Sequence, residues 1–153
     1  MRIAYRTVAL LVALGVVFQA SVIAFGMFGL FVALDGGAIV TAGTTAPNPG
    51  FDLHLGVGYS VLPALALLLL IVSFFARVRR GVLWAALVLA AVVVQVLLGG
   101  FAHELPAVGL LHGVGAFVVL ALALTAAWAS RRTRPAAAAE VGDASTARPV
   151  ERA

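Results

Sequence analysis

The sequence predicts an all-α integral membrane protein, a bundle of four transmembrane helices arranged as two helical hairpins. Of its 153 residues, 63% are hydrophobic and only 10% are charged, whereas roughly a quarter of the residues in an average soluble domain are charged. A soluble domain of this size exposes too much surface for such a composition. Four apolar runs are each long enough to cross a hydrocarbon core of ~30 Å, so we expect the lipid bilayer to surround the chain.

The four runs define one predicted transmembrane domain, residues 1–130. They cover residues 8–34, 53–76, 82–100 and 108–130. A signal peptide is the alternative for the first run, but that run is longer than a usual signal sequence and lacks a suitable cleavage site at Phe18-Gln19-Ala20. We therefore expect an uncleaved first helix. Residues 131–153 are rich in Ala and Pro and show no apolar periodicity, which predicts a disordered tail.

The charge pattern predicts how the chain crosses the membrane. All ten basic residues are arginines, and none lies in residues 35–52 or 101–107, the connections after the first and third runs. Under the positive-inside rule both termini and the turn at residues 77–81 are cytoplasmic, in a multi-pass protein of the plasma membrane. The net charge of +4 and the pI near 11.1 thus reflect topology, and nucleic acid is not an expected partner.

Two stretches resemble each other and place a histidine in each hairpin. LHLGVGYS begins at Leu53 and LLHGVGAF at Leu110, and the helix before each carries one glutamine, Gln19 or Gln95. Two hairpins of the same orientation form a parallel repeat about an axis along the membrane normal. Such a repeat would bring the histidines together at similar depth. The glutamines are expected to form hydrogen bonds between helices; holding a water molecule is the alternative.

Paired imidazoles on opposite sides of an axis are the arrangement that ligates one planar metal centre from both faces, and neutral imidazole is a good ligand for iron. The predicted ligands are His54 and His112, and the predicted cofactor is a b-type heme. Small residues beside them would leave a low helix face for a porphyrin; these are Gly58, Gly113, Gly115 and Ala116. The alternatives are close helix packing for the glycines and simple hydrogen bonding for the histidines. His103, beside Glu104, is expected to be a solvated loop residue.

The segment QVLLGGFAHELPAVGLLHGVGAF, Gln95 to Phe117, resembles the third and fourth helices of one half of heme A synthase. That family has two four-helix halves, each with a histidine pair around a heme. The resemblance implies that His112 matches the ligand on the fourth helix of a half and His54 the ligand on its second helix. The chain is also similar to small four-helix membrane proteins of actinobacteria, which fits its use of arginine alone.

The chain departs from heme A synthase in features that bear on activity. Leu55 follows His54 where the family has an arginine, and the nearest upstream acid is Asp52 rather than a glutamate one turn away. The paired cysteines of many members are missing, because the chain has no cysteine. Only one half is present, although a homodimer would rebuild two. Heme ligation is therefore carried over, and heme A synthesis is not.

These observations predict a small heme protein that serves electron transfer, with a redox partner or a quinone, or heme handling. The alternative is a structural or accessory membrane protein without a cofactor. A complete enzyme is not expected, because the predicted spans offer no acid–base pair for bond-making chemistry. A transporter would show several polar groups at mid-depth, whereas the candidates here are the two glutamines.

Overall fold

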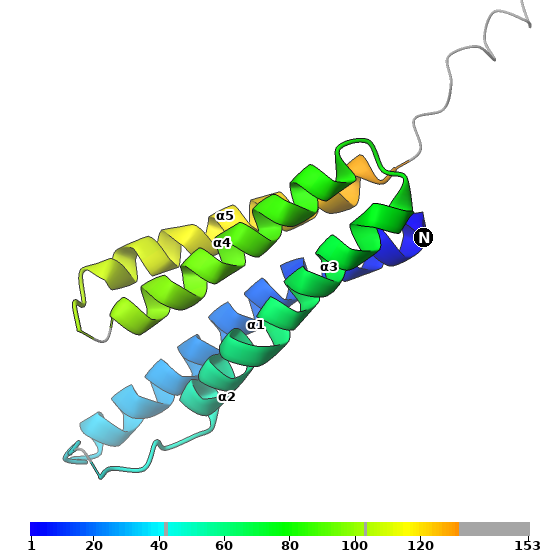
Figure 1. Cartoon of the computed structure of the whole chain (residues 1–153). Coiled ribbons are helices and arrows are strands. Elements are labelled where there is room, and N and C mark those ends of the chain that lie inside the picture. The colour runs from blue at the N-terminus through cyan, green and yellow to red at the C-terminus, as the bar shows by residue number, and fades with distance from the viewer. Residues whose placement is uncertain (42, 103, 132–153) are drawn as a thin grey trace, which may run out of the picture.

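The computed structural model describes residues 1–41, 43–102 and 104–131, and this part of the chain contains helices and no strand. The elements are α1 (Arg2–Asp35), α2 (Gly50–Gly56), the π-helix η1 (Val57–Val61), α3 (Leu62–Ala76), α4 (Gly81–Phe101) and α5 (Val108–Ala129). Because α2, η1 and α3 follow one another without a break, the described chain forms four long rods (Figure 1). All four are long and apolar enough to cross a membrane.

Each predicted apolar run corresponds to one of these rods. The largest difference is at the start of α1, which begins at Arg2 instead of Val8. Hydropathy marks only the apolar run, whereas the arginine-containing segment before it is also helical. The predicted tail falls on residues 132–153, which lie outside the described residues, as does His103.

The rods pack so that each touches two neighbours. The helix α1 contacts α5 and the α2–α3 rod, and α4 contacts α5 and α3. We call residues 2–76 the first hairpin and residues 81–129 the second hairpin. Figure 1 shows the two hairpins side by side where α3 turns into α4, and diverging toward their opposite ends.

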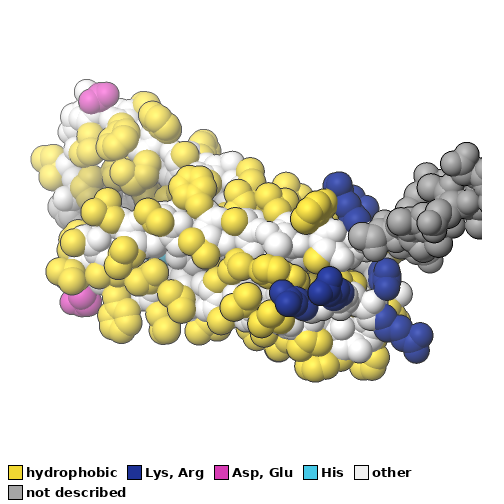
Figure 2. Space-filling view, turned by 90° about the horizontal axis from the view of Figure 1, so that it is seen from above, with side chains coloured by type: hydrophobic (Ala, Val, Ile, Leu, Met, Phe, Trp, Pro, Cys, Tyr) yellow, Lys and Arg dark blue, Asp and Glu magenta, His cyan; other side chains and the backbone are white. Residues whose placement is uncertain are grey.

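The two ends of the bundle differ in charge. In Figure 2 the arginines gather at one end and the acidic side chains lie at the other, with an apolar surface between them. We call these the arginine end and the acidic end. At the arginine end one hydrogen bond joins the hairpins, in which the Tyr5 hydroxyl donates to the Gly81 carbonyl oxygen at 3.0 Å. A second ties α1 to the end of α3, since Arg2 Nη2 donates to the Arg77 carbonyl oxygen at 2.9 Å.

The buried core occupies only the half of the bundle nearer the arginine end. Its members are mainly valine, alanine and leucine, together with one fully buried tyrosine: Tyr5, Val8, Ala9, Val12, Ala13, Val16, Leu62, Ala66, Leu69, Ala76, Ala85, Val88, Val92, Val119, Ala123, Ala126 and Ala127. In α4 the last member is Val92, and in α5, which runs the opposite way, the first is Val119. Contacts between the hairpins are therefore concentrated between these two residues and the arginine end.

The outer surface of the rods is as apolar as their interior. Large side chains such as Phe74, Phe117 and Trp128 are each at least 65% exposed. Soluble monomers rarely expose apolar patches of more than a few hundred Å², and a hydrocarbon environment removes the penalty. The fold is therefore that of a membrane-spanning four-helix bundle.

We expect Tyr5→Phe to lower the free energy of unfolding by about 1 kcal/mol, because the ring still packs while the Gly81 carbonyl loses its donor. Tyr59→Phe is the matched control, since that side chain is 55% exposed and its hydroxyl makes no hydrogen bond within the described residues. Unfolding in mixed micelles with increasing dodecyl sulfate measures both. Equal stabilities of the two variants would contradict the assignment.

Candidate functional site

The two histidines selected from the sequence meet in the structure. His54 lies in α2 of the first hairpin and His112 in α5 of the second. Their ring centroids are 6.1 Å apart and the ring planes are inclined at 70°. Both side chains are partly buried. The imidazoles therefore converge across the bundle, at the level where the apolar core ends.

Each histidine is held by the glutamine of its own hairpin through two reciprocal hydrogen bonds. Gln19 Nε2 donates to the His54 carbonyl oxygen at 2.9 Å, and His54 Nδ1 lies 3.2 Å from the Gln19 carbonyl oxygen. In the second hairpin Gln95 Nε2 donates to the His112 carbonyl oxygen at 2.9 Å, and His112 Nδ1 lies 3.0 Å from the Gln95 carbonyl oxygen. The expected hydrogen bonds of both glutamines to a neighbouring helix are confirmed.

These contacts determine the protonation pattern of the neutral rings. A carbonyl oxygen only accepts hydrogen bonds, so Nδ1 must carry the proton in both histidines. Nε2 then holds the free lone pair. Within the described residues neither Nε2 atom of His54 or His112 has a hydrogen-bond partner. Each ring thus keeps its metal-binding nitrogen available.

The separation of the rings agrees with ligation of a single metal ion. An imidazole nitrogen binds a transition metal at about 2 Å, and the ring centre lies about 1 Å behind that nitrogen, so two rings on opposite sides of one ion have centres about 6 Å apart. The observed 6.1 Å is close to this value, and together with the 70° inclination it is also a separation at which two aromatic rings pack edge to face.

The glycines near the site have different neighbours, and two of them face the glutamines. A Cβ atom at Gly58 would lie 2.6 Å from Gln19 Nε2, and one at Gly115 would collide with Gln95 Oε1. Nothing lies within 4 Å of a Cβ at Gly113, while Ala116 packs against the apolar core. Gly58 and Gly115 therefore make room for carboxamides, and Gly113 lies on an exposed part of α5.

The glutamines leave one acceptor each without a partner. Gln19 Oε1 and Gln95 Oε1 are buried and accept no hydrogen bond from the described residues. An unsatisfied buried acceptor costs about 1–3 kcal/mol. The level of the histidines is therefore polar on both sides, in contrast to the valine and alanine core beside it.

Sequence reasoning missed the π-helix η1, which follows His54 after one turn. In this segment the amide of Leu62 donates to the Val57 carbonyl oxygen, the i→i+5 pattern that accommodates one additional residue. The sequence does contain a signal for it. The segment from the histidine to the second glycine of Gly-Val-Gly is HLGVG in the first hairpin, one residue longer than HGVG in the second hairpin. The π-turn immediately precedes Pro63 in the first turn of α3.

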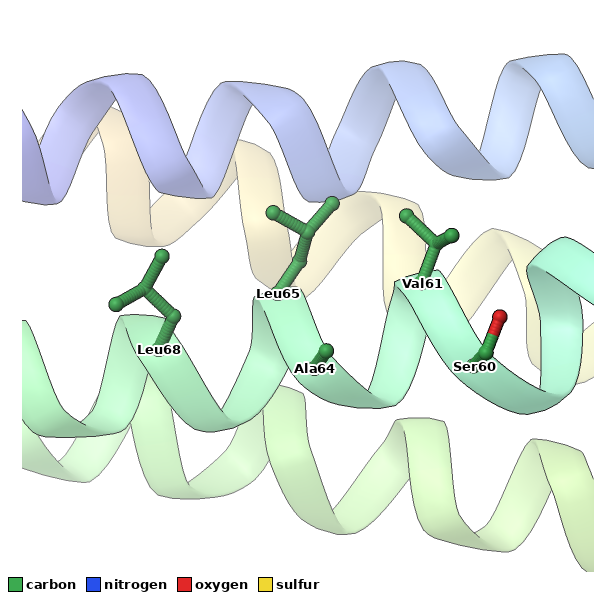
Figure 3. Close-up of a pocket in the computed structure, with 5 residues that line it drawn as sticks. All are labelled: Ser60, Val61, Ala64, Leu65 and Leu68. Carbon is green, nitrogen blue, oxygen red and sulfur yellow. The ribbon is translucent and has the colours of Figure 1, made fainter.

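A groove of ≈ 410 Å³ lies on the surface of η1 and α3, away from the histidine pair. Its lining residues are Ser60, Val61, Ala64, Leu65 and Leu68 (Figure 3). The Ser60 hydroxyl donates to the Gly56 carbonyl oxygen of its own helix at 2.5 Å. The groove offers apolar contacts, as expected of a surface that faces lipid.

No protein-family model, curated protein or solved structure matches this chain.

The two glycines on either side of Val114 should respond differently to alanine. Gly115→Ala is expected to displace the Gln95 carboxamide and to lower the free energy of unfolding by about 1–3 kcal/mol, whereas Gly113→Ala should be nearly neutral because its Cβ meets open space. Unfolding of both variants in mixed micelles measures the difference. A Gly115→Ala protein as stable as Gly113→Ala would show that the carboxamide is not tightly held.

Proposed function

We propose that this chain is a small membrane protein that binds one b-type heme, with His54 and His112 as its axial ligands. The observation that carries the proposal is the convergence of two imidazoles from different hairpins at a centroid separation of 6.1 Å. Both have Nδ1 bonded to a backbone carbonyl, the usual arrangement of a metal-ligating histidine.

The donor set favours a porphyrin over a bare ion. Two imidazoles alone supply two ligands, and a porphyrin supplies four more nitrogens in the plane between them. A flat macrocycle needs space between the hairpins, and a groove of ≈ 370 Å³ is lined by Tyr59 of η1 together with residues at the end of α4, among them Val96 and Gly100. The packed apolar core between the hairpins ends at Val92 and Val119.

The protein's own contributions are ligation, burial and position. A bound heme would supply a one-electron redox centre. The chain would hold the two imidazoles, keep water out on the arginine-end side with its packed valine and alanine core, and place the cofactor near one membrane face. This suits electron transfer to a redox partner or quinone, or heme handling.

The internal repeat and the orientation are part of the proposal. In each hairpin a glutamine on the first rod and a histidine on the second make the same two hydrogen bonds. The single additional residue of the first hairpin coincides with the π-helix. Both features support a parallel repeat. The clustering of arginines at one end supports a cytoplasmic arginine end and an acidic end that faces outward.

A structural or accessory role is the second candidate, and the ring geometry favours it as well. Aromatic rings pack edge to face at centroid separations of about 4.5–7 Å, which includes the distance between His54 and His112. In that case the histidines would join the hairpins directly, without a cofactor. A spectrum distinguishes the two roles.

We expect protein purified in mild detergent from heme-supplied cells to show a sharp Soret band and, on reduction, an α-band typical of two imidazole ligands. His54→Ala and His112→Ala should each abolish this low-spin spectrum, because one axial ligand is lost, and His103→Ala should retain it. A colourless wild-type protein under ample heme supply would support the structural role instead.

The orientation is testable because the chain has no cysteine of its own. In intact cells a membrane-impermeant maleimide should label Thr44→Cys, in the connection that lacks arginine. Arg79→Cys, in the turn between α3 and α4, should react only after the membrane is opened. The reverse labelling pattern would overturn the proposed orientation.

A further inference from the structure

We infer that Gln19 and Gln95 are positioning residues, which hold both imidazoles in the Nδ1–H tautomer and in a fixed orientation before any ligand binds. This inference rests on the proposed heme site. It goes beyond that site by assigning the preparation of the ligands to two residues that would not touch the metal. Each glutamine acts only on the histidine of its own hairpin.

The two hydrogen bonds in each hairpin form a closed unit. Gln95 contributes its carboxamide N–H to the His112 backbone and its own backbone carbonyl to the His112 ring. The bond from the Gln95 carboxamide sets the distance and rotation between α4 and α5 beside His112. The bond from the His112 ring depends on that placement, since Nδ1 reaches the Gln95 carbonyl oxygen only when the two residues lie opposite each other on the two helices. Loss of the carboxamide should therefore release the ring as well.

The surroundings of the carboxamides are shaped to keep them in place. Gln19 is only 9% exposed, and the glycines Gly58 and Gly115 leave space where a Cβ would strike a carboxamide. Gly99 likewise leaves space for the His112 ring, because a Cβ at Gly99 would lie 3.2 Å from His112 Cε1. Small residues thus surround the units formed by glutamine and histidine.

The π-helix gives the two units the same contacts despite a difference in sequence spacing. Gly58 follows His54 by one residue more than Gly115 follows His112. The π-turn over Val57–Val61 begins within this interval, and Gly58 nevertheless faces Gln19 as Gly115 faces Gln95. The glutamine contact is therefore kept in both hairpins although the spacing is not.

A glutamine that only joined helices would have a different effect on the rings. It would stabilise the hairpin and leave the imidazole free to exchange its proton between the two nitrogens. A positioning glutamine keeps its own backbone carbonyl oxygen beside Nδ1 and so determines which ring nitrogen carries the proton. The tautomer of each histidine therefore separates the two roles, and it is measured without heme.

The test uses full-length protein with ¹⁵N-labelled histidine, produced without heme and studied in detergent at a pH where the imidazoles are neutral. The background is His103→Ala, so that two rings are observed. Both should show a single Nδ1–H tautomer in their ¹⁵N spectra. Gln95→Met, which keeps the size of the side chain but removes the donor, should give a tautomer mixture at His112 and leave His54 unchanged. Gln19→Met should do the converse.

A dominant Nε2–H tautomer in the unsubstituted background would overturn the inference, as would folded methionine variants whose tautomers do not change. If the methionine variants fail to fold, the tautomers of the unsubstituted background still decide, and Gly115→Ala offers a milder displacement of Gln95. Heme titration adds an independent result, because loss of such an indirect contact lowers affinity by about 10- to 100-fold. Locked tautomers in a protein that binds no heme would overturn the heme site alone, whereas heme binding with mixed tautomers would overturn the positioning role alone.

Discussion

The reciprocal hydrogen bonding between glutamine and histidine is the interaction on which the arrangement of the site depends. In a hydrocarbon environment a polar side chain must find its partners inside the protein. Each hairpin meets part of this requirement by pairing one glutamine with one histidine through both side chains and both backbones. The contacts that engage the carboxamide nitrogens and the Nδ1 atoms also orient the two imidazoles. Stability of the hairpin and geometry of the site are therefore linked.

The uneven core determines where the two hairpins are in contact. Between the histidines and the arginine end, small and β-branched side chains bring the hairpins into contact, and Tyr5 joins α1 to the start of α4. Toward the acidic end from the histidines, α1 contacts its own hairpin: Gly50 lies against the backbone of Gly26, and at the surface Asn48 Nδ2 donates to the Phe25 carbonyl oxygen at 2.9 Å. The first hairpin is thus closed at its acidic end, while the second is free to diverge from it.

Much of this fold was predictable from the sequence, because hydropathy and arginine placement act over whole segments. The four spans and the bonds from Gln19 and Gln95 to neighbouring helices follow from the cost of polar groups in lipid. The purpose of individual glycines did not follow. Spacing placed Gly58 and Gly115 beside the histidines, but only the rotation of packed helices decides whether such a residue faces a cofactor, lipid or a carboxamide. The π-helix was hidden for a similar reason, since one additional residue in a repeat is visible only when both copies are aligned with their contacts known.

The choice between a cofactor site and a purely structural layer also depends on what else could occupy this level of the bundle. One turn toward the arginine end, valine and alanine join the hairpins without any polar atom. Leucine or alanine in place of the four polar residues would extend that packing and would remove the two unpartnered acceptors, Gln19 Oε1 and Gln95 Oε1. Packing alone therefore gives these glutamines and histidines no advantage over apolar residues. The proposed heme site would give the two imidazoles, each with a free Nε2, a role that packing does not.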